Sequence, residues 1–387
     1  MLPAQWIGPR PSGLEIGVIL FVGTIGILIP GVQPIVLGAL HLANRIDLVQ
    51  LGHASTSELL CMGGAAALSA ALLPPRHLRA IGCLAALLMA GGNWATPYLS
   101  GETVSLIRAL TGATGGILIW VTSCMIARSA TPDRWAAIWL AVQTLAQLLF
   151  GLAMTGWAEP LWGAAGDFQM LALASIVAAA ASLLLPRAFV DLPKTEHAQS
   201  STGIPSWRGI AGLIVGFLFM MFIVSVWVYY EPIAHDAGLS SKVSDNAALL
   251  SLGCQVLGAS TAAVFAGRLR WYPILMGCAV VDLGLVWILG SRPSETLFFI
   301  DAAVFGFIWL FILPIEVPML IEADPSRRAA VLNGGVNLLG GSIGPSVAAE
   351  LVAPDNMRGA LWLAAGCLVV CVVLATALKL VIRPRPE

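Results

Sequence analysis

The chain has 387 residues, of which 58% are hydrophobic and 11% charged, with a mean hydropathy of +0.88. Soluble proteins are roughly 45–50% apolar and about 25% charged, so this composition excludes a soluble enzyme and indicates a chain that mostly faces lipid. The formal net charge is −1 and the isoelectric point is near 6.5, which leaves no basic surface for nucleic acid.

Twelve apolar runs follow one another along the chain, each long enough to cross a membrane as a helix, which takes about 20 residues. The first six cover residues 14–40, 57–73, 80–99, 103–127, 134–155 and 168–185. The other six cover residues 210–230, 246–266, 273–289, 296–321, 329–352 and 360–382. We therefore predict an all-α membrane protein of twelve transmembrane helices.

One long polar stretch, at residues 191–207, divides these runs into two halves. It is rich in Ser, Thr and Pro, a composition typical of a linker. We interpret it as a cytoplasmic connection between a six-helix bundle at 1–190 and a second one at 208–387.

Positive charge predicts the orientation of these spans. With the N-terminus placed in the cytoplasm, fifteen of the twenty Lys and Arg residues fall on the cytoplasmic side and four on the other. The remaining one, Arg108, lies inside the fourth span. Because cytoplasmic loops are enriched in Lys and Arg, we expect both termini in the cytoplasm. We also expect a monomer in the inner membrane.

The two halves carry traces of an internal repeat. The segment Pro132-Asp-Arg-Trp-Ala-Ala137 recurs as Pro325-Ser-Arg-Arg-Ala-Ala330 at an offset of 193, and Cys61 meets Cys254 at the same offset. Two similar halves that both start in the cytoplasm are parallel repeats, related by an axis along the membrane normal.

The fourth span contains the most specific pattern, Arg108-Ala-Leu-Thr-Gly112-Ala-Thr-Gly115-Gly116. It resembles the fourth-helix pattern of the major facilitator superfamily, and the resemblance extends over essentially the whole chain. The loop with Arg76 and Arg79 keeps the basic residues of the family pattern but lacks its aspartate, and the fifth span lacks the Gly-Pro pattern of drug/proton antiporters. These absences favour uptake over drug efflux. The resemblance implies that spans one, four, seven and ten surround a central cavity.

Ionisable residues inside these spans are candidates for function, because each costs about 2.5–3.5 kcal/mol at the centre of a membrane helix on insertion scales. Arg108 and Asp301 are equivalent in the repeat, so we predict that they face each other across the cavity. Arg108 would bind an anionic group or a proton-linked partner, while Asp301 or Glu231 takes up and releases a proton. The alternative is a structural ion pair, or an arginine that only binds backbone carbonyls.

Other polar residues in the spans are predicted to contact the substrate: Gln33, Gln143, Gln147, Tyr229, Tyr230, Asn333 and Asn337. Because Gln143 and Gln147, like Asn333 and Asn337, are four residues apart, each pair shares one helix face and could instead join helices. Glu316 stands between two helix-bending prolines, which favours a proton-coupling role at an inner gate or a hydrated carboxylate. Asp282, in the middle of the ninth span, has no assigned role.

The sequence lacks nucleotide-binding and hydrolase motifs, and the seven cysteines lie inside apolar runs without a CxxC pair. We therefore expect no enzyme activity, cofactor or metal. Our prediction is a secondary transporter that imports a small organic anion with protons by alternating access. Two alternatives stay open: proton-coupled efflux of lipophilic compounds, and a receptor or assembly factor that does not transport.

Overall fold

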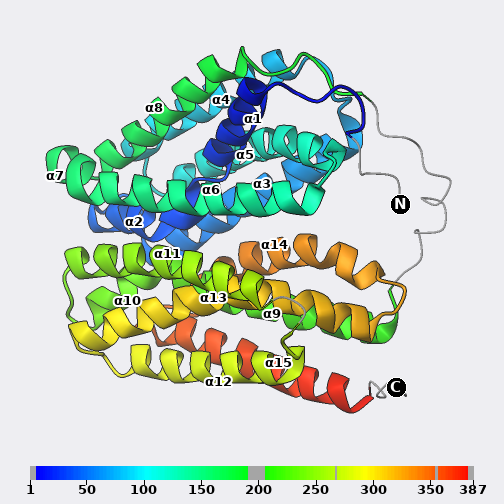
Figure 1. The fold of residues 1–387 in the computed structure, drawn as a ribbon. Helices are drawn as coiled ribbons and strands as arrows, with labels where there is room; N and C mark the ends of the chain where they lie inside the picture. The colour runs from blue at the N-terminus through cyan, green and yellow to red at the C-terminus, as the bar shows by residue number, and fades with distance from the viewer. Residues whose placement is uncertain (1–5, 191–204, 266–267, 354–355, 382–387) are drawn as a thin grey trace. The chain divides into compact units, whose positions relative to one another are not determined.

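The computed structural model describes residues 6–190, 205–265, 268–353 and 356–381 (Figure 1). The chain divides into two compact units, Met1–Lys194 and Thr195–Glu387. Most of the expected linker at 191–207 lies outside the described residues. In the described parts of both units, the secondary-structure elements are helices.

The first unit contains helices α1 to α8. They are α1 (Gly13–Gly26), α2 (Ile29–Leu42), α3 (Leu48–Leu72), α4 (Leu78–Ala95), α5 (Glu102–Arg128), α6 (Pro132–Ala153), α7 (Glu159–Trp162) and α8 (Ala164–Ser182). A 3-10 turn at Thr96–Tyr98 follows α4, and a π-helical turn at Met154–Ala158 precedes α7. Helix α5 packs against α1, α3 and α4, so it occupies the centre of this unit.

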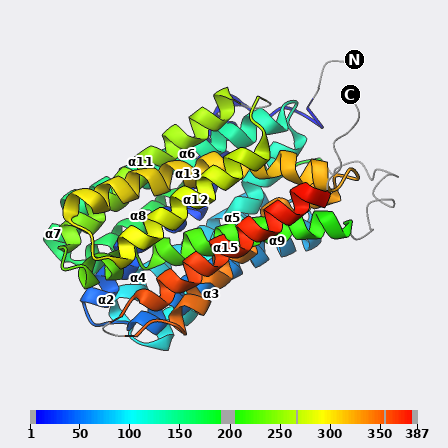
Figure 2. The same cartoon turned by 90° about the horizontal axis from the view of Figure 1, so that it is seen from below.

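The second unit contains helices α9 to α15. They are α9 (Trp207–Val228), α10 (Tyr230–Asp236), α11 (Ser241–Val264), α12 (Trp271–Gly290), α13 (Glu295–Ala323), α14 (Arg328–Ala349) and α15 (Arg358–Val381). Helix α9 packs against α14 and α15, and α13 packs against α11 and α12. Helices α12 and α15 also lie side by side, which Figure 2 shows from below.

Each of the twelve expected runs falls on a helix or, for the first run, on a pair of helices. In the described residues, ten segments are both long and apolar enough to cross a membrane. The other two expected spans coincide with α3 and α14, which have 25 and 22 residues. Both are long enough to span a bilayer, but neither is among the ten apolar segments.

Helix α3 begins well before the expected position 57. It starts at Leu48 because Asp47 and Gln50 form a capping box. The Asp47 carboxylate accepts the N–H of Gln50 at 2.8 Å, and the Gln50 side chain accepts the N–H of Asp47 at 3.0 Å. The first turns of α3 are polar, so hydropathy alone placed the start of the helix too late.

The first expected span is interrupted between α1 and α2. Pro30 lies in the first turn of α2, where its missing N–H breaks no helical hydrogen bond. At the break, the carbonyl oxygen of Ile27 accepts a hydrogen bond at 3.0 Å from Nε2 of Gln147 on α6. This side-chain bond satisfies a carbonyl group at the break.

Both units contain the same kind of close helix contact. A Cβ atom at Gly112 of α5 would overlap the backbone carbonyl oxygen of Glu58 on α3, and a Cβ at Gly306 of α13 would overlap that of Ser251 on α11. Helix backbones approach this closely only where no side chain lies between them. Glu58 and Ser251 are separated by the repeat offset of 193.

The turn between α13 and α14 is fixed by Asp324. Its carboxylate accepts the N–H of Ala329 at 3.1 Å and the hydroxyl of Ser326 at 2.8 and 2.9 Å. Desolvation raises the pKa of Asp324, but these hydrogen bonds outweigh it and hold the pKa below its usual value. The ionised carboxylate therefore caps the start of α14.

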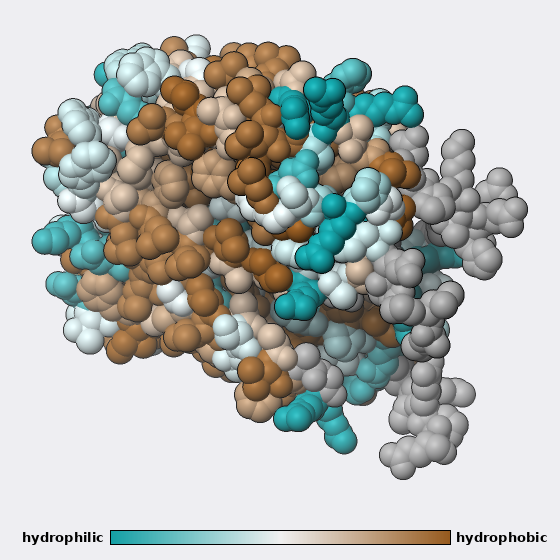
Figure 3. Space-filling view, turned by 45° about the horizontal axis from the view of Figure 1, so that its top comes forward, coloured by the Kyte–Doolittle hydropathy of each residue, from teal (hydrophilic) through white to brown (hydrophobic). Residues whose placement is uncertain are grey.

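The surface is largely apolar on the face that Figure 3 shows. Leu380, Trp287 and Trp362 are 81, 75 and 74% exposed, and many further leucines and valines are also uncovered. Water opposes such extensive apolar exposure, whereas lipid accepts it. The surface therefore agrees with a chain that crosses the membrane many times.

Candidate functional site

Arg108 of α5 forms a buried ion pair with Glu58 of α3. Its Nε donates to Oε2 of Glu58 at 3.1 Å, and its Nη2 donates to Oε1. Two parallel bonds of this kind match the planar guanidinium to the carboxylate. Both side chains are 1% exposed, so each charge is compensated by the other instead of by solvent.

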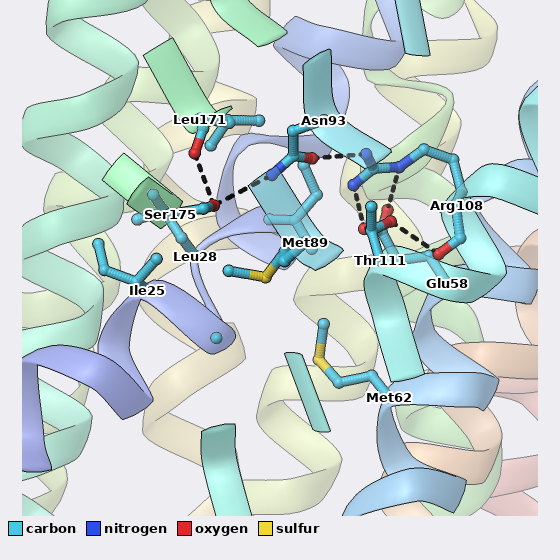
Figure 4. Close-up of a pocket in the computed structure, with 12 residues that line it drawn as sticks. Ile25, Leu28, Glu58, Met62, Met89, Asn93, Arg108, Thr111, Leu171 and Ser175 are labelled. Carbon is cyan, nitrogen blue, oxygen red and sulfur yellow. Dashed lines mark hydrogen bonds and ion pairs between the residues drawn. The ribbon is translucent and has the colours of Figure 1, made fainter. Parts of the chain in front are cut away.

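Other residues of the first unit hold the rest of the guanidinium. Its Nη1 donates to Oδ1 of Asn93 on α4 at 2.8 Å and to the hydroxyl of Thr96 at 3.4 Å. Asn93 donates in turn to the hydroxyl of Ser175 on α8 at 3.4 Å (Figure 4). The guanidinium carbon lies 5.4 Å from the centre of the Phe168 ring, a cation–π contact. Arg108 is therefore held from three neighbouring helices.

A small cavity of about 20 Å³ lies beside the ion pair. Arg108, Glu58 and Thr111 line its polar side, and Thr111 donates to Oε1 of Glu58 at 3.4 Å. Met62 and Met89 line it as well, as Figure 4 shows. The volume suits one or a few water molecules, so a solute that reaches Arg108 has to displace side chains. Flexible methionines are suited to such movement.

Among the predicted substrate contacts of the first unit, Gln33 is linked to the helix turn that carries Glu58. It is fully buried in α2 and accepts a hydrogen bond at 3.1 Å from Ser55, which precedes Glu58 by one turn of α3. Gln147 instead binds the Ile27 carbonyl and joins α6 to the break in the first span. Gln143 is half-buried on the same helix.

In the second unit, a buried carboxylate is surrounded by amides. Oε2 of Glu316 on α13 accepts hydrogen bonds from Nδ2 of Asn333 at 3.1 Å and from Nδ2 of Asn337 at 2.7 Å, both on α14. The three side chains are 1, 7 and 8% exposed. The structure therefore joins one predicted proton-coupling residue to two predicted substrate contacts.

Asp301 of α13 lies in a separate, aromatic environment. Its Oδ2 accepts a hydrogen bond from the hydroxyl of Tyr230 at 3.2 Å. The Tyr230 ring lies 4.6 Å from Phe298 and 6.4 Å from Phe305, centre to centre. Tyr229 and Glu231, the chain neighbours of Tyr230, are also buried.

Asp282 is fully buried in the middle of α12. Among the described residues, no donor binds either of its carboxylate oxygens. Asp301, on the neighbouring α13, acts on it electrostatically. Helix α12 packs against both α13 and α15, so Asp282 is buried inside the second unit.

Comparison with known proteins gives a clear result for the fold. No protein-family model and no curated protein matches the sequence. A mutant of the nucleoside transporter NupG superposes with a TM-score of 0.68 at 12% identity, over 96% of this chain and 100% of that one. An inward-facing, occupied structure of a bacterial homologue of the human lysosomal transporter Spinster gives 0.63 at 14% identity, over 95% of each chain. This chain has the major facilitator superfamily fold.

Within this fold, Arg108 binds a carboxylate other than that of Asp301, its equivalent in the repeat. The repeat matched Arg108 with Asp301, but the carboxylate bound to Arg108 is Glu58, and Asp301 is bound by Tyr230. The predicted common chamber for Arg108 and Asp301 stays a prediction.

Glu58 and Asn93 are the residues of this site that the sequence analysis did not single out. Glu58 is the second residue of the apolar run 57–73, so it lies at the predicted end of a span and not among the ionisable residues inside one. Spans two and four are predicted to run in the same direction, and Glu58 and Arg108 both lie near the start of their apolar runs, so similar depths are expected for them. Matching the two residues by depth could have identified the pair.

Proposed function

We propose that this major facilitator chain is a secondary transporter that imports a small organic anion together with protons by alternating access. We further propose that it works as a monomer in the inner membrane, with both termini in the cytoplasm. The fold shared with two transporters supports the transport class, and the distribution of Lys and Arg supports the orientation.

The observation that carries the proposal is the buried Glu58–Arg108 pair. An anionic group that approaches Arg108 competes with the Glu58 carboxylate for the same guanidinium donors. Once displaced, Glu58 is a charge without a partner in a medium of low dielectric constant, and it takes up a proton. When the anion leaves, Glu58 rebinds Arg108 and releases the proton. Anion and proton are therefore carried together.

The surrounding residues support this exchange. Asn93 and Thr96 bind Nη1, which Glu58 does not use, so they can hold the guanidinium while its other donors change partner. Phe168 on one side excludes water from the charge. In the second unit Asp301, Glu231 and Glu316 remain our candidates for further proton-coupling groups, and Tyr229, Tyr230, Asn333 and Asn337 for substrate contacts.

The test is uptake of labelled mono- and dicarboxylates into proteoliposomes under an imposed pH gradient. The wild-type protein is expected to accumulate an anion only when protons flow inward. Glu58→Gln should still exchange internal for external anion, but the pH gradient should no longer accelerate its net uptake. Arg108→Ala should lose both activities.

Glu102→Gln is the matched control, because Glu102 lies on the same helix as Arg108 but is 62% exposed. It should transport like the wild type. Size-exclusion profiles must show that each variant is folded, with Glu58→Asp as the milder substitute where Glu58→Gln is not. An Arg108→Ala protein that accumulates the anion as well as the wild type would refute the proposed anion site.

A second candidate function is export of lipophilic compounds. The aromatic cluster of the second unit favours it: Trp227 lies 5.5 Å from Trp309 and 6.5 Å from Phe305, ring centre to ring centre. Such rings could stack on a flat apolar solute. Resistance to hydrophobic toxicants on expression, lost in Trp309→Ala, would support export over anion uptake.

A further inference from the structure

Glu316, Asn333 and Asn337 surround a point on α9 that bears no side chain. The two asparagines lie one turn apart on α14 and both donate an amide hydrogen to Oε2 of Glu316. Because that carboxylate oxygen can only accept, the amide nitrogens must face it. The two amide oxygens therefore point elsewhere.

These oxygens have no donors in the described parts of the chain. That holds for Oε1 of Glu316 and for Oδ1 of both Asn333 and Asn337. Nor does any ion pair of the described residues include Glu316. All three side chains are more than nine-tenths buried, where a charge or an acceptor without a partner is costly.

The two amide oxygens and the other carboxylate oxygen of Glu316, Oε2, converge beside Gly216 of α9. A Cβ atom built on Gly216 would lie 2.8 Å from Oδ1 of Asn337, 3.3 Å from Oδ1 of Asn333 and 3.3 Å from Oε2 of Glu316. Because glycine has no side chain, three oxygens from two other helices can approach α9 this closely. We call this buried, oxygen-lined surrounding of Glu316 the compartment; the ionised carboxylate gives it one negative charge.

We propose that this compartment, formed by Glu316, Asn333 and Asn337 against Gly216, binds a sodium ion. A proton on Glu316 would neutralise the charge but would leave at least one amide oxygen without a partner. A water molecule has two hydrogens for the amide oxygens, but it leaves the charge uncompensated. A small monovalent cation does both, because carboxylate and amide oxygens are the hard ligands that such cations prefer.

The ion would tie three helices of the second unit together. Glu316 stands on α13, the asparagines on α14 and the bare glycine face on α9, so occupancy would oppose their separation. The site belongs wholly to the second unit and is distinct from the Glu58–Arg108 pair. Sodium would thus be a second coupling ion beside the proton, and its binding can be tested without any transported solute.

The test is thermal unfolding of the full chain, purified in detergent, in sodium, potassium or choline chloride at equal ionic strength. An ion that binds only the folded state raises the unfolding midpoint in a saturable manner. We expect sodium to raise the midpoint by a few degrees above choline, and potassium to have a much smaller effect.

Two variants and one control locate the site. Gly216→Ala places a methyl group among the three oxygens. It should raise at least tenfold the sodium concentration that gives half of the midpoint shift, and Asn337→Ala should do the same. Gly335→Ala is the matched control, because a Cβ at Gly335 on α14 meets nothing within 4 Å. It should keep the full sodium response.

Glu316→Gln covers the case in which Gly216→Ala does not fold. It keeps the shape of the side chain and removes the charge, so it should fold and lose the sodium response. Equal midpoints of the wild type in sodium and choline, as expected for water alone, would overturn the proposal. So would a full sodium response in Glu316→Gln. Neither result bears on transport through Arg108.

Discussion

The first unit pairs its buried carboxylate, Glu58, with a guanidinium, whereas the second unit surrounds Glu316 with two amides. The repeat sharpens this contrast. At the offset of 193, Glu58 corresponds to Ser251 and Arg108 to Asp301, so the second unit has no ion pair at the matching place. Yet the close contact between the two helices is present in both units.

The comparison of the two units indicates which features are kept in both halves of a repeated membrane fold. Contact between helices depends on small residues and on the backbone, and those requirements are the same in both units. A buried charge pair contributes little net stability and can be replaced as a unit. Charges can therefore diverge between the units while the helix packing stays, and each unit can bind a different ion.

The largest expected effect is a difference in stability between the variants of Glu58 and of Glu316. Glu58→Gln leaves Arg108 buried without a counter-charge and should lower the free energy of unfolding by about 3–5 kcal/mol. Glu316→Gln removes a charge that has no basic partner among the described residues, and its side-chain oxygen still accepts both asparagine amides. The free energy of unfolding of Glu316→Gln should differ from that of the wild type by no more than about 1 kcal/mol. Denaturant unfolding in detergent micelles measures both.

A double variant checks the reason for this loss. Glu58→Leu together with Arg108→Met replaces the pair by apolar side chains of similar length and should recover most of the stability lost in Glu58→Gln, while anion exchange is lost together with Arg108. Similar losses in Glu58→Gln and Glu316→Gln would mean that the two carboxylates are compensated in the same way.

A smaller effect is expected at the shared helix contact. Gly112→Ala and Gly306→Ala each force a methyl group onto a backbone carbonyl of the neighbouring helix, and each should cost about 1–3 kcal/mol. Gly64→Ala on α3 is the control, since a Cβ there meets nothing within 4 Å. If one of the two substitutions is neutral, the contact is not equivalent in the two units.

The smallest effect concerns the turn before α14. Asp324→Ala should lower the free energy of unfolding by about 1 kcal/mol at neutral pH, as for other helix caps. Because the pKa of folded Asp324 is below its unfolded value, this stabilisation is present above the unfolded pKa and is lost as the pH falls through the folded one. Thr131, its counterpart in the first unit, makes no capping hydrogen bond to the described residues, so Thr131→Ala should change little. Thermal unfolding at neutral and acidic pH tests the difference.

The sequence located the apolar helices along the chain, but it did not indicate which way each side chain points around its helix. Long apolar runs located the spans, because lipid requires them. They did not indicate which side of α5 carries Arg108, so the runs alone did not give its neighbours in α3 and α4. The repeat suggested Asp301 instead, since it compares positions and not contacts. Asn333 and Asn337 were found from their spacing, but the side chain they bind, Glu316, was assigned to a separate role.

The break between α1 and α2 determines where the first span can bend. On one side of it, α1 is fixed to α5, where Thr122 donates to the carbonyl oxygen of Ile19 at 2.8 Å and Gly26 lies against the backbone of Gly115. At the break itself, one side-chain bond from Gln147 stands in place of continuous helical bonding. The first span can therefore bend at this break without disrupting a run of helical hydrogen bonds, while the contacts of α1 with α5 stay in place.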